Sequence, residues 1–193
     1  ALLNAIAAKA KTLADAAQSA ASGAAAAASA AQETANSAAS SATTANNLIA
    51  DISNDNKLTA VEKSSSRKEW DIIAAELSVN DTQATAFGIT TEKTTYDNAF
   101  QALANYLNNG TTWVSGVPSW LADANLGTTT TIDGATYRSM WKTYYDSRTA
   151  LLNKIAEVAK EAADSAQGTA DSKTTLWATL AIAQSSAVIG DMF

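Results

Sequence analysis

The stretch that decides the fold runs from Ala14 to Asn47 and reads ADAAQSAASGAAAAASAAQETANSAASSATTANN. It contains no large apolar side chain, and such a composition alone is compatible with a disordered linker. The spacing of its alanines predicts a helix instead, because small apolar residues recur in alternating steps of four and three, the pattern of a left-handed coiled coil. This alanine seam comprises Leu3, Ala7, Ala10, Ala14, Ala17, Ala21, Ala24, Ala28, Ala31, Ala35, Ala38, Ala42, Ala45, Ile49 and Ile52.

The alanine seam predicts a rod that associates with other copies of the chain. Alanine has the highest helix propensity, so a helix over residues 1–52 is expected, roughly 78 Å long at 1.5 Å per residue. Methyl groups bury little area, so the rod needs partners. Larger side chains beside the seam, at Ile6, Leu13 and Leu48, broaden its apolar face at both ends. We therefore expect a homo-oligomer of parallel chains, with three strands favoured over two.

The beginning of the chain occurs again near its end. Residues 1–21, ALLNAIAAKAKTLADAAQSAA, match residues 150–170, ALLNKIAEVAKEAADSAQGTA, at 13 positions with a constant offset of 149. Self-similarity of this kind is typical of arrays of repeated units. We expect residues 150–193 to form a second coiled-coil rod that opens the next unit of a longer parent. Its seam continues through Leu152, Ala156, Ala159, Ala163, Ala166 and Ala170.

Residues 53–149 carry most of the large apolar side chains and predict a helical bundle. Helices are expected over about 60–86, from Thr90 or Thr91 to about 108, and from Asp133-Gly134 without a break into the second rod. The loop 109–132 between them holds Trp113 and Trp120, which we expect to pin it to the bundle. The fold class is therefore all-α, with long alanine-rich coiled-coil helices flanking a small bundle. The expected core faces are Val61, Trp70, Ile73, Ala74 and Leu77; Tyr96, Ala99, Phe100, Leu103 and Leu107; and Tyr137, Met140, Trp141, Tyr144, Arg148, Leu151 and Ile155.

The junction of the first rod and the bundle, DISNDNKLTAVE at residues 51–62, has the spacing of an EF-hand calcium loop. Asn56 stands where that loop has glycine, and Asn tolerates the left-handed conformation needed there. The alternative is an Asx-rich turn followed by a capping box, Thr59 to Glu62, linking two helices. Calcium is the one cofactor that the sequence suggests. Its candidate ligands are Asp51, Ser53, Asp55, the carbonyl of Lys57, Thr59 and Glu62.

Composition argues against several classes of function. The chain has no cysteine and no histidine, so disulfides, thiolate chemistry and a histidine general base are excluded. Its net charge is −6 without any lysine and arginine cluster, which argues against a nucleic-acid partner. No window is apolar enough for a membrane span. No phosphate loop, serine elbow or zinc spacing occurs, so we expect no enzyme and no catalytic residue.

Three separated motifs resemble the helical module of bacteriophage tail-tip and central tail-fibre proteins of the host-specificity (J-like) class. They are NDNKLTAVEKSSSRKEWDIIAAEL, GITTEKTTYDNAFQALANYL and TTIDGATYRSMWKTYYDSRTALLNKIA, which together span about residues 53–160. The resemblance implies tandem modules beside alanine-rich coils on trimeric fibres. It also implies an extracellular place in the virion tail, contact with other tail proteins and a structural role in projecting toward a host receptor.

Two functions from other classes stay open at this stage. A bacterial surface adhesin or stalk segment would use the same helical rod on a cell. A calcium-stabilised helical binding module would use the loop 51–62 to order the junction between rod and bundle.

Overall fold

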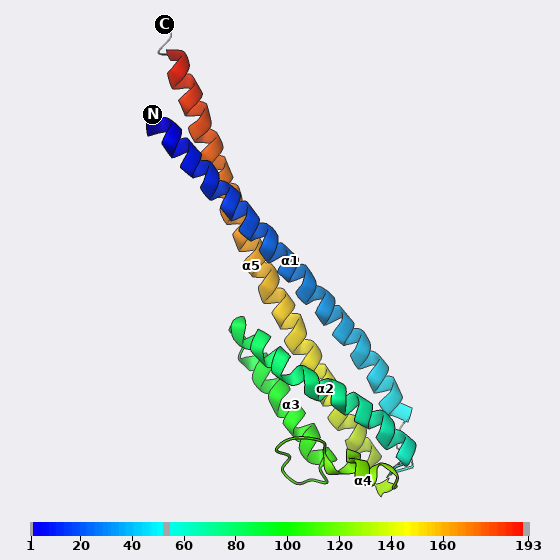
Figure 1. The fold of residues 1–193 in the computed structure, drawn as a ribbon. Helices are drawn as coiled ribbons and strands as arrows, with labels where there is room; N and C mark the ends of the chain where they lie inside the picture. Colours follow the sequence, from blue (N-terminus) through cyan, green and yellow to red (C-terminus); the bar gives the residue numbers. More distant parts are fainter. Residues whose placement is uncertain (1, 52–54, 191–193) are drawn as a thin grey trace. The chain divides into compact units, whose positions relative to one another are not determined.

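The structure, a computed structural model, describes residues 2–51 and 55–190 (Figure 1). Within these ranges the long elements are all helices, which confirms the all-α prediction: α1 (Leu2–Asp51), α2 (Ala60–Ala86), α3 (Thr91–Leu107) and α5 (Gly134–Gly190). Two short turns, η1 (Ser119–Leu121) and α4 (Asp123–Leu126), lie in the loop before α5. A small antiparallel ladder joins β1 (Lys57–Leu58) to β2 (Thr130–Thr131). None of the helices in the described ranges is long and apolar enough to cross a membrane.

The chain divides into two compact units, and both long helices contribute to each. The hairpin unit comprises Ala1–Gln32 and Ala156–Phe193, whereas the bundle unit comprises Glu33–Ile155. Packing thus groups the second part of α1 with the bundle, although its sequence continues the alanine-rich pattern of the first part.

In the hairpin unit, α1 and α5 lie side by side and run in opposite directions (Figure 1). The ammonium of Lys11 lies 5.9 Å from the ring centroid of Trp177. Alanines are buried on both helices: Ala14 and Ala21 on α1, and Ala156, Ala159, Ala163 and Ala170 on α5. In this unit the alanine-rich parts of α1 and α5 pair with each other, and the association of residues 1–52 and 150–193 with copies in other chains stays a prediction.

The alanine seam follows the more buried side of α1, and its role as the seam of a coiled coil between chains stays a prediction. Residues of the seam point inward along α1, whereas Leu3 at its start is 47% exposed and Ile52 lies outside the described residues. Its own chain thus covers part of the seam, and association of three parallel copies stays a prediction. The buried positions are Ala14, Ala21, Ala35, Ala38, Ala42, Ala45 and Ile49, and the half-buried ones are Ala7, Ala10, Ala17, Ala24, Ala28 and Ala31.

The bundle unit packs aromatic rings from α2, α3 and α5 into one core. Trp70 stacks on Phe100 with ring centroids 5.2 Å apart, and Tyr144 lies edge-on to Phe100 at 6.0 Å. Every residue of the core face expected on α3 is buried. On α2 the buried face is Lys63, Ser66, Trp70, Ile73, Asn80 and Ala84. Val61 does not lie on this buried face and is 76% exposed, so the prediction that it belongs to the core was wrong.

Local signals set the ends of the helices where the sequence predicted them. Thr59 and Glu62 form the capping box of α2. Gly88, with φ of 68°, takes the left-handed conformation after α2 that glycine adopts without strain. At the start of α5, the Oδ1 of Asp133 accepts a hydrogen bond of 2.7 Å from the backbone N–H of Thr136.

The loop between α3 and α5 is pinned by its tryptophans, as predicted. Trp113 lies edge-on to Trp70 and Phe100, with ring centroids 5.4 and 5.6 Å apart, and Trp120 lies edge-on to Tyr106 at 5.2 Å. T-shaped pairs at these separations are favoured by the quadrupoles of the rings.

Candidate functional site

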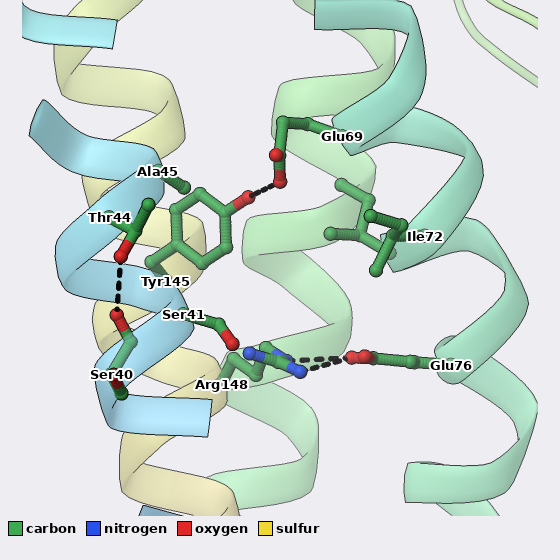
Figure 2. Close-up of a pocket in the computed structure, with 10 residues that line it drawn as sticks. Ser40, Ser41, Thr44, Ala45, Glu69, Ile72, Glu76, Tyr145 and Arg148 are labelled. Carbon is green, nitrogen blue, oxygen red and sulfur yellow. Dashed lines mark hydrogen bonds and ion pairs between the residues drawn. The ribbon is translucent and has the colours of Figure 1, made fainter. Parts of the chain in front are cut away.

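A polar cleft in the bundle unit lies between α1, α2 and α5 (Figure 2). It has a volume of about 260 Å³. Helix α1 contributes short polar side chains because its seam faces inward, so serines and threonines occupy the flanking positions. Helix α2 contributes carboxylates and α5 contributes two long polar side chains. The lining residues are Ser40, Ser41, Thr44, Ala45, Glu69, Ile72, Ile73, Glu76, Tyr145 and Arg148.

Arg148 joins three helices at one side of this cleft. Its Nε donates a hydrogen bond of 2.8 Å to Oε2 of Glu76 on α2, and its Nη2 forms an ion pair with the same oxygen. Its Nη1 donates to the backbone carbonyl of Ala38 on α1 at 3.4 Å. The side chain of Arg148 is 8% exposed and that of Glu76 is 33% exposed. A guanidinium buried to this extent requires its carboxylate partner.

Tyrosine hydroxyls form the other side of the cleft and the core behind it. Tyr145 donates a hydrogen bond of 2.8 Å to Oε2 of Glu69 (Figure 2). Burial, reinforced by Glu69, raises the pKa of Tyr145. The hydroxyls of Tyr96 and Tyr144 lie 3.3 Å apart, and burial raises the pKa of both. These phenols therefore stay neutral hydrogen-bonding groups at physiological pH.

The chemistry available in the cleft is hydrogen bonding. Glu76 is paired with Arg148, Glu69 accepts from the hydroxyl of Tyr145, and Thr44 donates to the carbonyl of Ser40 at 3.2 Å. No lining residue is a histidine or a cysteine. Over the described part of the chain, no group of three or more acidic side chains is arranged to hold a metal ion. The arrangement thus fastens α1 to α2 and α5.

The candidate calcium loop is described in part, because Ser53 and the side chain of Asp51 lie outside the described residues. Oδ1 of Asp55 accepts from the backbone N–H of Lys57 at 3.0 Å, an Asx turn. Oε2 of Glu62 accepts from both the backbone N–H and the hydroxyl of Thr59, each at 2.7 Å. The described residues thus form the turn and capping box of the alternative interpretation, and calcium binding stays a prediction.

The same loop is tied to the start of α5. Asn56 is left-handed, with φ of 59°, as expected for its position. Its carbonyl accepts from the N–H of Ile132 at 3.0 Å, and its Oδ1 accepts from the N–H of Gly134 at 3.1 Å. The residues that would surround a calcium ion therefore also connect α2 with α5.

Sequence reasoning missed a buried lysine. Lys63 is fully buried on α2, and its ammonium donates to the carbonyl of Asn125 at 2.9 Å and the hydroxyl of Thr128 at 3.0 Å. Burial lowers its pKa. A signal was available, because Lys63 lies seven residues before Trp70 and so shares its helical face. Lys63 thus holds the long loop against α2, and Trp113 and Trp120 of the loop hold it against α2 and α3.

Comparison with known proteins gives one informative similarity. The chain is 42% identical over 123 residues to a protein described as "Tail fiber protein" from Enterococcus phage phiEF24C. The match covers 64% of this chain and 6% of that protein, so the chain spans a small part of its relative's length. No family model matches the chain. No solved structure is significantly similar to it.

Proposed function

We propose that this chain is a structural segment of a bacteriophage tail fibre. The observation that carries the proposal is the 42% identity over 123 residues to a phage tail fiber protein. The bundle supports it, because its polar cleft is occupied by internal pairs such as Arg148 with Glu76, which is the chemistry of a scaffold. The proposal assigns the chain no catalytic role and places it in the virion tail.

In this role, the segment carries a compact bundle on alanine-rich helices. Helices α1 and α5 each continue from the hairpin unit into the bundle unit without a break in hydrogen bonding. Alanine at the contact between two helices permits close approach of their backbones, which gives a thin support. The bundle then offers its surface to neighbouring tail proteins or to a receptor on the host, in the manner of the tail-tip proteins that the motifs resemble.

We also propose that three copies of the chain assemble into a trimeric fibre. The exposed apolar side chains of the hairpin unit include Leu13 at 51%, Leu176 at 64% and Ile182 at 68%, and association of chains would cover them. Light scattering distinguishes the states, because one chain has a mass of 19.9 kDa and a trimer three times this value. A monomer at all concentrations would remove the trimer and leave the tail-fibre assignment intact.

The assignment itself is tested by location. Antibodies raised against residues 1–193 should label the tail fibres of purified particles of the encoding phage in electron micrographs and should block adsorption. Antibodies against the capsid serve as the control, since they label heads without blocking. Labelling of bacterial surfaces with unlabelled particles would instead favour the adhesin or stalk alternative.

A further inference from the structure

The two copies of the internal repeat differ sharply in the exposure of the same residues. Residues 1–4 and 150–153 both read ALLN, and Ile6 corresponds to Ile155 at the offset of 149. In the first copy, Leu2, Leu3 and Ile6 are 76%, 47% and 45% exposed, whereas their counterparts Leu151, Leu152 and Ile155 are 0%, 3% and 3% exposed. Identical side chains in the two copies of the repeat are therefore buried in one copy and exposed in the other.

The second copy of the three residues is buried within the bundle unit. Leu151, Leu152 and Ile155 belong to the bundle unit, where the preceding turns of α5 carry Tyr144 and Arg148 into the contacts with α2 and α3 described above. The first copy belongs to the hairpin unit, which has no such bundle. Three large apolar side chains within two turns of a helix form a stripe that prefers to be buried.

We propose that Leu2, Leu3 and Ile6 form a docking surface for a helical bundle of the kind made by residues 33–155. The bundle is supplied by a preceding copy of the repeat in the same polypeptide, whose last helix continues into α1 as α5 continues past Thr149. The repeat supports this occupant because it conserves the three residues that the bundle covers. Leu13 is a contrast, since its counterpart Ala162 is a small exposed residue. The inference does not rest on the proposed function.

A tandem chain tests the proposal directly. Residues 1–149 are joined to residues 1–193, so that Thr149 precedes the second Ala1 as it precedes Ala150 in the natural sequence. Because the protein has no cysteine, each single-cysteine variant reports one position through its rate of reaction with a soluble disulfide reagent. The variants are Ile6→Cys, Leu13→Cys and Ile155→Cys, made in the single chain and in the second copy of the tandem chain.

The expected pattern is specific to Ile6. In the single chain Ile6→Cys reacts about as fast as Leu13→Cys, and in the tandem chain it reacts at least about tenfold more slowly because the site opens only transiently. Leu13→Cys keeps its rate in both chains, and Ile155→Cys is slow in both, which verifies that the bundle is folded.

Three results would overturn the proposal. Equal reactivity of Ile6→Cys in the two chains shows that a preceding bundle leaves the stripe uncovered. Protection in the single chain that grows with concentration shows that a second copy of the chain is the occupant. A tandem chain in which Ile155→Cys is also fast shows that the offset of 149 does not join two folded bundles. A second probe, Leu3→Cys, repeats the comparison at a position one turn away and must agree.

Discussion

The side-chain oxygen Oδ1 of Asn56 accepts a hydrogen bond from the backbone N–H of Gly134, 3.1 Å away and 78 residues later in the chain. The turn before α2 thereby satisfies the first donor of α5, since the N–H groups in the first turn of a helix have no partner within it. Asn56 does this from a left-handed backbone conformation, with φ of 59°. One residue therefore joins the beginnings of two helices.

We expect Asn56→Ala to destabilise the chain more than Asn56→Gly. Glycine keeps the left-handed conformation and removes only the hydrogen bond, at about 0.5–1.5 kcal/mol, whereas alanine adds a backbone cost of roughly 1–2 kcal/mol. Urea unfolding followed by circular dichroism measures both. Asn109, also left-handed with φ of 59°, is a control position without the contact to α5. Equal stability of wild type and both Asn56 variants would show that the link to Gly134 is dispensable.

The pair Arg148 and Glu76 should behave as a coupled unit. Glu76→Gln leaves a buried guanidinium without its carboxylate, and we expect a loss of about 1–3 kcal/mol, moderated by the partial exposure of Glu76. The double variant Arg148→Met/Glu76→Leu should recover much of this loss, because no charge remains buried. A double-mutant cycle in urea, completed by the single variants Arg148→Met and Glu76→Leu, measures the coupling. The surface pair Lys142 and Asp146, both more than half exposed, is the matched control and should show little coupling.

Asp133, which caps the start of α5, makes the free energy of unfolding depend on pH. Hydrogen bonds from Thr136, first from its backbone N–H, lower the pKa of Asp133. Because the pKa of Asp133 is lower in the folded state, its carboxylate stabilises the fold at every pH above its unfolded pKa, near 3.8. This stabilisation is lost as the pH falls through the pKa of the folded state. The difference in urea midpoint between wild type and Asp133→Asn should therefore shrink between about pH 5 and pH 2. A difference that is constant with pH would contradict this origin.

Glu62→Gln separates the two interpretations of the loop 51–62. Glutamine can close a capping box with Thr59, but it cannot serve as the charged bidentate ligand of calcium. Oε2 of Glu62 already accepts two hydrogen bonds from Thr59. We therefore expect that calcium changes the melting temperature of neither wild type nor Glu62→Gln. Calorimetric titration of chelator-treated protein is the independent measurement. Calcium binding by wild type that disappears in Glu62→Gln would establish the metal site instead.

The helices and their faces could be predicted because local chemistry determines them. The seam phase from Ala7 to Ile49 follows from the 3.5-residue repeat, and the start of α2 follows from Thr59 and Glu62. The error at Val61 has a physical cause. The buried face of α2 is set by Lys63, Ser66 and Trp70, and Val61 lies two residues, about 200° of helix, away from Lys63. Because polar residues are expected to face solvent, Lys63 and Ser66 were not recognised as part of the buried face of α2.

The partner of the alanine seam could not be predicted in the same way. A heptad repeat specifies that one face is covered and leaves open whether another chain or the same chain covers it. The internal repeat at residues 150–170 supplies a second seam of the same kind, and attachment within one chain gives it a high effective concentration. The cleft also depends on tertiary structure, because Arg148 and Glu76 are 72 residues apart and carry no local motif.

The internal repeat has an evolutionary consequence. Its two copies, residues 1–21 and 150–170, match at 13 positions with a constant offset of 149. Unequal recombination between them would insert or delete 149 residues, a length that includes α1, α2 and α3. Because the crossover would join matching positions of the alanine seam, the register of the seam would be kept while the number of bundles changes.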